Sequence, residues 1–399
     1  MQSVGYSHCK WILGGVIHRI VWSACSLTFI LACSRDNVYD GKDSSWFNEV
    51  LIEYSKEGVT IESFANEGTV FTFVFSNGHS IGFDRKSVGV VTIGIQGFWI
   101  LNGNITNTPL ETPGEELIPV GNNSDCLSGI VEGYTEWTFY YGNSTRLVFV
   151  KSLFASDPDI VVRGINHRGY CIAAPENTLP AFRLSKLQGF NYAEADIHFT
   201  ADGVPVLIHD ATVDRTSDGK GLVKDMTWDE ISRLDFGGFR SDEFAGTRIP
   251  SLEDFLDLCS DIELWPYLEL KAGSYEQITQ LVYMVEQSGL KDKVTYISFF
   301  PGLLYYVTKS DKTASIGLLV DTPVSESVIQ TIQSLKTGSN YVFIDSSDYS
   351  ETTVSLCQRV SIPLEVWTID SRTKVCSLPQ YVSGVTSNWL HAGRLLAEM

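Results

Sequence analysis

The chain has 399 residues, more than one ordinary domain holds, so we expect two domains that each bury their own core. Its 44% hydrophobic and 19% charged residues exclude an intrinsically disordered protein and one embedded in a membrane throughout. The formal net charge of −19 argues against nucleic acid as a partner, so an anionic substrate would need a bound cation or a few placed basic side chains.

The first 32 residues have the layout of a secretory signal peptide. Lys10 and Arg19 lie in a segment without acidic residues, and an apolar run covers residues 20–32. That run is about 13 residues long, shorter than the roughly 20 that span a bilayer, so a transmembrane helix is disfavoured. Its end resembles the bacterial lipobox, which implies cleavage before Cys33 and lipid attachment there. We therefore expect a cell-envelope protein lipid-anchored to the outer membrane, periplasmic or surface-exposed, with a plain cleaved signal peptide or a buried helix as alternatives.

Polar, turn-forming residues fill positions 33–45. This composition is typical of a flexible linker, and we expect a tether between the lipid anchor and the first domain. The remaining cysteines are scattered without paired spacing, which predicts mostly free thiols and no zinc site. They are Cys126, Cys171, Cys259, Cys357 and Cys376.

Strand-like patterns dominate residues 46–155, for which we predict an all-β, sandwich-like domain. Phe71, Phe73 and Phe75 alternate with Thr and Val, which places the rings on one face of a strand. Asn and Gly pairs that suit tight hairpins follow at residues 77–78, 102–103 and 142–143. The segment Trp99-Ile-Leu-Asn-Gly is similar to β-sandwich modules of bacterial surface lipoproteins, which implies a spacer or a module that binds a glycan or a protein.

From residue 160 to residue 399, strand and helix signals alternate, as in parallel strands joined by crossover helices. Helical spacing is clear at residues 278–285 and 328–335, and residues 176–178 offer N-caps for a helix through Gln188. Candidate strands cover residues 160–165, 191–199, 204–209, 264–270, 294–297, 316–320, 341–344, 364–369 and 382–386.

These nine candidates compete for the eight places of a TIM-type (βα)8 barrel, which is the fold we predict for this domain. One candidate is therefore surplus. Residues 204–209 follow the turn sequence Thr200-Ala-Asp-Gly203, so they form either a hairpin arm or a barrel strand reached by a short crossover.

Ionisable residues lie at the ends of several of these strands, where a parallel barrel forms its active site. Glu194 and Asp196 are two residues apart, so both carboxylates point the same way, and Glu269 and Lys271 repeat this spacing. Three carboxylates at one mouth repel one another unless a cation lies between them, and oxygen ligands suit Ca²⁺ or Mg²⁺. The alternatives are a solvated strand end for the first pair and a local ion pair for the second.

Two histidines are expected at the same rim, because His167 follows the first strand and His209 ends the candidate strand 204–209. Hydrolysis of a phosphodiester needs a base for the nucleophile and an acid for the departing alkoxide, and histidine suits both near neutral pH. Either histidine taken alone has a structural role as its alternative. Arg168 and Lys271 are candidates for holding the phosphate oxygens.

Eight short motifs, taken in order, resemble the glycerophosphodiester phosphodiesterase family over about residues 161–399. They are His167-Arg168-Gly169, Pro175-Glu-Asn-Thr178, Glu194-x-Asp196, Thr200-x-Asp-Gly203, His209-Asp210, Asp214-Arg-Thr216, Ile249-Pro250 and Leu268-Glu-Leu-Lys271. The resemblance implies a TIM-type barrel, one divalent cation held by Glu194, Asp196 and Glu269, and His167 and His209 as general acid and base. It also implies that the glycerol 2-hydroxyl attacks phosphorus and that water then opens a cyclic phosphate to glycerol 3-phosphate.

Three motifs depart from this family's pattern. Asn166 replaces the usual Ala before His-Arg-Gly, Trp-Thr-Val-Asn appears as Trp367-Thr-Ile-Asp370, and the late Thr-Asp motif reads Thr386-Ser-Asn388. An added carboxylate at Asp370 would alter the fit of the substrate. Trp367 is either a platform for the glycerol moiety or a core aromatic residue.

Two other functions compete with this hypothesis. A phospholipase-type phosphodiesterase acting on phosphoinositides or lysophospholipids would expose apolar loops near the barrel mouth, with Phe239, Phe244, Phe299 and Phe300 as candidates. A non-catalytic surface binding protein is the second alternative. The completeness of the ionisable set argues against it.

Overall fold

The computed structural model describes residues 38–39, 45–67, 70–84, 87–110, 112–118, 127–151, 162–338 and 340–397. The predicted signal peptide and the predicted lipid attachment site, Cys33, lie outside these residues, and so does Cys126. Within them, no helix combines the length and the apolar character needed to cross a bilayer. The other four cysteines predicted to be unpaired, Cys171, Cys259, Cys357 and Cys376, are free thiols.

Residues 45–56 form a helix, α1 (Ser45–Lys56), so the strand pattern expected from residue 46 is wrong at its start. Leu51 and Tyr54 lie three residues apart on one face of α1 and are both buried, which a strand could not achieve. The short strand β1 (Val38–Tyr39) falls within the predicted tether and pairs in parallel with β4 (Ser80–Asp84). Part of residues 33–45 therefore belongs to a sheet.

The N-terminal domain contains two sheets that share one hydrophobic core. One has the order β1-β4-β3-β2 and the other β10-β9-β8-β5-β6-β7. The remaining strands are β2 (Ile61–Glu67), β3 (Val70–Phe75), β5 (Gly89–Ile93), β6 (Phe98–Leu101), β7 (Asn104–Pro109), β8 (Leu127–Glu132), β9 (Glu136–Tyr141) and β10 (Arg146–Val150), with a 3-10 turn at Gly114–Leu117. The rings of Phe73 in β3 and Trp137 in β9 meet at 4.9 Å, edge to face. A sandwich-like β-domain is thus confirmed.

The three predicted hairpins are present in these sheets. Gly78 has a φ of 80° between β3 and β4, and Asn102 and Gly103 have φ values of 50° and 84° between β6 and β7. Ser144 has a φ of 69° between β9 and β10. Glycine and asparagine tolerate positive φ better than other residues, which explains the first two turns, whereas in the third the positive φ falls on Ser144, the residue after the predicted pair.

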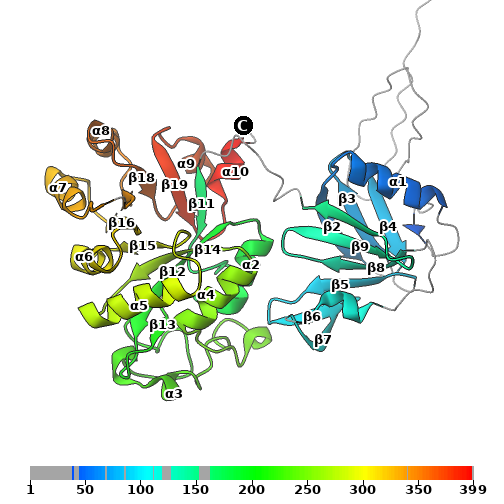
Figure 1. The fold of residues 1–399 in the computed structure, drawn as a ribbon, viewed down its shortest axis with the longest axis horizontal. Helices are drawn as coiled ribbons and strands as arrows, with labels where there is room; N and C mark the ends of the chain where they lie inside the picture. The colour runs from blue at the N-terminus through cyan, green and yellow to red at the C-terminus, as the bar shows by residue number, and fades with distance from the viewer. Residues whose placement is uncertain are drawn as a thin grey trace, which may run out of the picture. The chain divides into compact units, whose positions relative to one another are not determined.

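Eight parallel strands of the second domain close into a barrel (Figure 1). They are β11 (Arg163–Asn166), β12 (Tyr192–Phe199), β14 (Trp265–Leu270), β15 (Thr295–Ser298), β16 (Ser315–Val320), β17 (Val342–Ser346), β18 (Leu364–Val366) and β19 (Val382–Ser387). β11 pairs with both β19 and β12, which completes the ring. The TIM-type barrel is confirmed.

The ninth candidate strand is a hairpin arm. β13 (Pro205–Leu207) pairs antiparallel with the end of β12, and Gly203 takes the positive φ of 84° that the tight turn requires. The residues between β13 and the next long helix hold only short elements, the 3-10 turns Val223–Asp225 and Asp242–Phe244 and the helix α3 (Trp228–Ile231).

Helices flank the barrel strands on the outside (Figure 1). They are α2 (Leu179–Leu187), α4 (Leu252–Asp261), α5 (Tyr275–Gln287), α6 (Pro301–Ser310), α7 (Glu326–Ser334), α8 (Glu351–Arg359), α9 (Arg372–Cys376) and α10 (Ala392–Ala397). Ile278, Leu281 and Val285 form the buried stripe of α5 that the helical spacing predicted. The carboxyl ends of the strands remain open to carry a site.

Candidate active site

The carboxyl ends of the barrel strands surround a pocket of about 270 Å³. Its walls are formed by His167, Arg168, Glu194, His209, Glu269, Lys271, Ile297, Phe299, Leu319, Asp345, Trp367, Thr368 and Thr386. All the barrel residues predicted for the site are in this set except Asp196, which is fully buried and reaches the cluster through an ion pair with Lys271. Strand register therefore assembles residues that lie up to 200 positions apart in the sequence.

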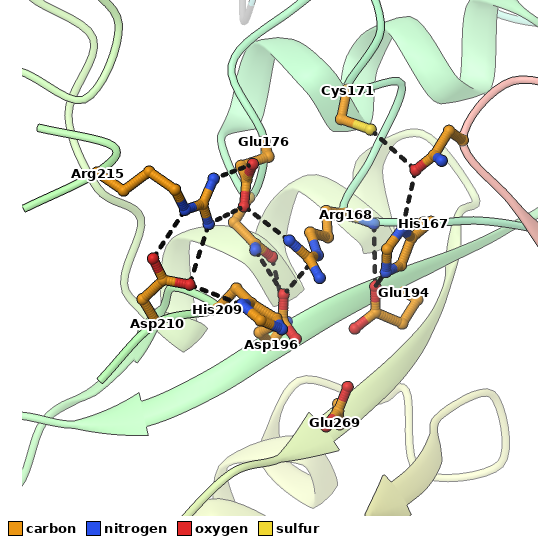
Figure 2. A network of polar contacts seen from close by, with 12 residues as sticks. His167, Arg168, Cys171, Glu176, Glu194, Asp196, His209, Asp210, Arg215 and Glu269 are labelled. Atoms are coloured by element: carbon orange, nitrogen blue, oxygen red, sulfur yellow. Dashed lines mark hydrogen bonds and ion pairs between the residues drawn. The ribbon is translucent and has the colours of Figure 1, made fainter. Parts of the chain in front are cut away.

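Three carboxylates converge at one side of this pocket (Figure 2). Glu194 and Asp196 project from β12, and Asp196 is in register with Glu269 of the neighbouring β14. One oxygen from each of the three carboxylates lies within 4.8 Å of the others, and all three residues are buried. This is an all-oxygen donor set of the kind that hard divalent cations such as Ca²⁺ and Mg²⁺ prefer.

The electrostatics of the three carboxylates fit a bound cation. Burial, followed by the negative charges of Asp196 and Glu269, raises the pKa of Glu194 well above its ordinary value. Burial and Asp196 raise the pKa of Glu269 to about 7. Oε1 of Glu194 is buried and has no hydrogen-bond partner, which is costly unless a ligand completes the site.

Two basic side chains compensate part of this charge. Lys271 Nζ lies 3.0 Å from Asp196 Oδ1 and 2.5 Å from Glu269 Oε1. Arg168 Nε lies 3.3 Å from Asp196 Oδ2. Burial alone would raise the pKa of Asp196, but Lys271 and Arg168 outweigh it and lower that pKa to about 2. Asp196 is thus the carboxylate that stays ionised without any added cation.

Arg168 is held by its backbone as well as by its side chain. Its φ is 55°, and its amide N–H donates to Glu194 Oε2 at 3.0 Å. The guanidinium donates from Nη1 to Glu176 Oε1 at 3.0 Å. Arg168 therefore links a predicted metal ligand to the polar network around Glu176.

His167 lies beside Glu194, with Nε2 at 3.9 Å from Glu194 Oε2. Its other ring nitrogen, Nδ1, is 2.8 Å from Oδ1 of Asn388. Burial, followed by the positive charge of Arg168, lowers the pKa of His167. A neutral imidazole is therefore favoured at this position.

His209 has a carboxylate as its partner instead. Its Nδ1 lies 2.7 Å from Asp210 Oδ1, and Asp210 accepts in turn from Arg215 Nε at 2.7 Å. Arg215 Nη1 also donates to Glu176 Oε2 at 2.7 Å, and Glu176 accepts from Arg168. A series of hydrogen-bonded ionisable side chains therefore connects His209 to Arg168 (Figure 2). The Arg215 hydrogen bond keeps the pKa of Asp210 well below its ordinary range, so this carboxylate is ionised and accepts the hydrogen bond of the His209 ring.

Apolar side chains line the part of the pocket next to the carboxylates. Ile297, Phe299 and Leu319 line it from β15, the residue after β15, and β16. Trp367 packs edge to face on Phe299, with ring centroids 5.6 Å apart, and donates from Nε1 to the carbonyl oxygen of Asp345 at 3.0 Å. The pocket thus pairs an ionic wall with an aromatic wall, as a molecule with a charged end and an organic end requires.

The four phenylalanines proposed as exposed rim residues divide evenly. Phe244 is buried, and Phe299 is a wall of the pocket. Phe239 and Phe300 are 46% and 56% exposed, respectively. The exposed apolar surface that they provide consists of two single side chains, which is ordinary for a protein surface.

The sequence does not predict several residues of the site, because their roles arise from tertiary contacts between the loops and strands at the rim of the barrel. Glu176 and Asn177 belong to the Pro-Glu-Asn-Thr motif and Arg215 to Asp-Arg-Thr, but the sequence predicts only helix N-caps for the first two and no role for Arg215. Asn388 stands out in the sequence only as a departure from the family pattern. Asp345 ends an apolar strand, and its sequence position gave no sign that Oδ1 would be buried in the pocket wall without a partner.

The domain that contains this pocket is similar in sequence to a known family of enzymes. The model of the glycerophosphoryl diester phosphodiesterase family matches residues 167–390. The glycerophosphodiester phosphodiesterase of Caldanaerobacter subterraneus subsp. tengcongensis is 33% identical over 211 residues, which is 52% of this chain and 86% of that protein. Glycerophosphodiester phosphodiesterase 1 of Bos taurus is 37% identical over 163 residues, 40% of this chain and 49% of that protein, so the match spans about half of the bovine relative.

Solved structures with a similar fold include phosphodiesterases as well. An Oleispira antarctica phosphodiesterase, determined in complex with the product sn-glycerol-3-phosphate, superposes with a TM-score of 0.54 at 25% sequence identity. The superposition covers 59% of this chain and 96% of that structure. A protein described as a putative glycerophosphoryl diester phosphodiesterase from Silicibacter pomeroyi DSS-3 matches with the same TM-score at 24% identity and supports the fold alone.

Proposed function

The chain belongs to the glycerophosphoryl diester phosphodiesterase family, and we propose that it hydrolyses glycerophosphodiesters to sn-glycerol 3-phosphate and an alcohol in a metal-dependent reaction. The observation that carries this proposal is the convergence of Glu194, Asp196 and Glu269 on one point beside two histidines. The complex of the Oleispira relative with sn-glycerol-3-phosphate supports the substrate class.

The three carboxylates are the ligands that we assign to a Ca²⁺ or Mg²⁺ ion. A divalent cation there would neutralise the crowded carboxylates and stabilise negative charge on the phosphate oxygens. Arg168 and Lys271 line the same wall, where their positive charges would bind the remaining phosphate oxygens. These cations explain how a chain with a net charge of −19 binds an anionic diester.

The partners of the two histidines suggest different roles. His167 bonds to a neutral amide and is favoured as the uncharged ring, so Nε2 is the group that accepts the proton of the attacking hydroxyl. His209 bonds to a carboxylate, Asp210, which can stabilise positive charge next to the ring during proton transfer, so we assign to His209 the proton that goes to the departing alkoxide. We therefore assign His167 as the general base and His209 as the general acid of the first step.

The reaction then proceeds in two displacements at phosphorus. The glycerol 2-hydroxyl forms a new P–O bond and loses its proton to His167, while the P–O bond to the alcohol breaks and the alcohol takes a proton from His209. This leaves a cyclic glycerol phosphate. In the second step water adds to phosphorus, the bond to the 2-oxygen breaks, and the two histidines exchange roles.

The test is the release of glycerol 3-phosphate from glycerophosphocholine and glycerophosphoethanolamine. It is measured with Ca²⁺ or Mg²⁺, with EDTA, and with the His167→Ala variant. We expect turnover only with a cation and with His167 intact. Turnover that survives both EDTA and His167→Ala rejects the mechanism, and a folded, metal-loaded protein without any diesterase activity would favour the surface-binding alternative.

We further propose the location predicted from the sequence, a lipid anchor at Cys33 that tethers the enzyme to the outer membrane. Only the segment Ile30-Leu31-Ala32-Cys33 supports it. In this setting the enzyme would act on deacylated phospholipid head groups, and the β-domain would serve as a spacer or bind a glycan or a protein. Fatty-acid labelling of the wild type but not of Cys33→Ser is the expected result, and equal labelling of both would contradict it.

A further inference from the structure

Asn388 lies between a catalytic histidine and a carboxylate that does not touch the pocket. Oδ1 of Asn388 is 2.8 Å from Nδ1 of His167. On its other side, Asn388 donates to Asp370 twice, from Nδ2 to Oδ2 at 2.5 Å and from the backbone N–H to Oδ1 at 2.8 Å. Asp370 and Asn388 also lie in two of the three motifs at which the sequence departs from the family pattern.

These contacts fix which way the Asn388 amide faces. An ionised carboxylate only accepts hydrogen bonds, so the amide must turn its NH₂ group to Asp370 and its oxygen to His167. The thiol of Cys171 donates to the same amide oxygen at 3.3 Å, which agrees with this orientation. Ser387 Oγ donates to Asp370 Oδ1 at 2.7 Å and helps to hold the carboxylate in place.

The amide orientation determines the tautomer of the histidine. Because Asn388 Oδ1 is an acceptor, His167 must carry its proton on Nδ1, which leaves Nε2 without a proton on the side of Glu194. We propose that Asp370 and Asn388 are positioning residues that act through His167. Asp370 orients the Asn388 amide, and the amide holds His167 in the tautomer whose Nε2 accepts a proton.

This inference rests on the proposed function in one respect, the role of His167 as a base. The tautomer itself does not depend on activity. It is therefore read directly from the ¹⁵N chemical shifts of the His167 ring in the full chain, identified by comparison with His167→Ala. If the proposed function were wrong, no kinetic effect could be measured, but the ¹⁵N chemical shifts would still report the tautomer of His167.

Three variants test whether Asp370 and Asn388 hold the tautomer of His167. Asn388→Ala removes the acceptor, and Asp370→Asn lets the Asn388 amide turn either way. For each we expect kcat on glycerophosphocholine to fall about 10- to 100-fold with KM little changed, and the His167 ring to become a mixture of tautomers. The exchange variant Asp370→Asn/Asn388→Asp puts a carboxylate directly on Nδ1–H, and we expect it to recover the single tautomer and most of kcat.

Asp348→Asn is the matched control. Asp348 follows β17 and, like Asp370, accepts from nearby groups at the carboxyl end of a barrel strand, here Ser350 and Thr353. It does not line the pocket. This variant loses the same charge and comparable hydrogen bonds, and we expect normal kcat and a normal His167 tautomer.

A purely structural role for the pair predicts another outcome. All the single variants, including Asp348→Asn, would then melt at lower temperature with kcat and the His167 tautomer unchanged, and this result would overturn the proposal. A wild-type ring protonated on Nε2 would overturn it as well. Should Asp370→Asn fail to fold, Asn388→Ala keeps Asp370 and decides by the same two measurements.

Discussion

The side chain of Asn177 makes two hydrogen bonds to Asp196, one to its carboxylate and one to its backbone N–H. Its Nδ2 donates to Asp196 Oδ2 at 2.7 Å, and its Oδ1 accepts from the Asp196 backbone N–H at 3.1 Å. Both residues are buried. A single asparagine from the loop before α2 therefore fixes the position and the direction of the central carboxylate on β12.

Replacing Asn177 by glycine should weaken binding of the divalent cation by about 10- to 100-fold, because supporting partners orient metal ligands. Glycine is the appropriate replacement because Asn177 has a φ of 56°, which glycine adopts without strain. The measurement is calorimetric titration of the metal-free protein with Ca²⁺ and with Mg²⁺.

Asn102→Gly is the matched control for that experiment. Asn102 has a similar φ of 50°, and its Oδ1 accepts from Val90 N–H at 2.8 Å in the β-domain. It should bind metal like the wild type. Equal affinities for all three proteins would show that Asn177 does not organise the site.

The sequence predicted the barrel and the ionic wall of the site because both depend on local patterns. Glu194 and Asp196 share a strand face, and periodic apolar residues reveal each helix. It did not predict α1, because the consecutive apolar residues Val50-Leu51-Ile52 resemble a strand. Nor did it predict that Asn388 meets His167, since the pairing of the first barrel strand with the last one brings together residues 221 positions apart.

The second prediction concerns the roles of the two histidines. With glycerophosphocholine, His167→Ala and His209→Ala should each lower kcat by about 10²- to 10⁴-fold. With a glycerophosphodiester of 4-nitrophenol, whose anion leaves without a proton, His209→Ala should regain most of its rate of 4-nitrophenolate release in the first step, and His167→Ala should not. The readout is kcat for glycerophosphocholine and the single-turnover rate of 4-nitrophenolate release for the second substrate, because opening of the cyclic phosphate still needs His209 as a base.

His79→Ala, in the β-domain, provides the control for loss of an imidazole outside the barrel and should act like the wild type on both substrates. A recovery of His167→Ala with the 4-nitrophenyl substrate would reverse the two assignments. If neither variant recovered, the departing alcohol would not take its proton from either histidine.

The third prediction concerns stability against pH in EDTA. The pKa of Glu269 is about 7, above its ordinary 4.5, so the folded chain holds this proton longer than the unfolded chain. The contribution of Glu269 to the free energy of unfolding therefore decreases as pH rises from 4.5 to 7, by up to about 3 kcal/mol at roughly 1.4 kcal/mol per pKa unit. Glu269→Gln should show a smaller decrease in urea unfolding between pH 5 and pH 7.5.

Asp196 does not obscure this slope, because its lowered pKa of about 2 places its own titration below pH 4. Metal binding needs the ionised carboxylates and releases their protons, so metal affinity should rise with pH up to about 7. Identical pH slopes for the wild type and Glu269→Gln would contradict the raised pKa. An affinity independent of pH would argue against Glu269 as a ligand.

The last prediction decides between the two interpretations of Trp367. As a platform for the glycerol moiety, its replacement by alanine should raise KM for glycerophosphocholine about tenfold, which corresponds to roughly 1.4 kcal/mol of lost aromatic packing. As a core aromatic residue only, the same change should lower the free energy of unfolding by about 3–5 kcal/mol and leave KM unchanged. Steady-state kinetics and urea unfolding of Trp367→Ala measure both quantities.

Two further variants separate packing from substrate contact. Trp367→Phe keeps a ring against Phe299 but loses the Nε1 hydrogen bond to Asp345, so a platform predicts a nearly normal KM. Phe343→Leu alters a fully buried ring in the same cluster that does not line the pocket, and should change stability alone. If Phe343→Leu raised KM as much as Trp367→Ala, the effect of Trp367 would come from repacking of the barrel interior, and the platform would be rejected.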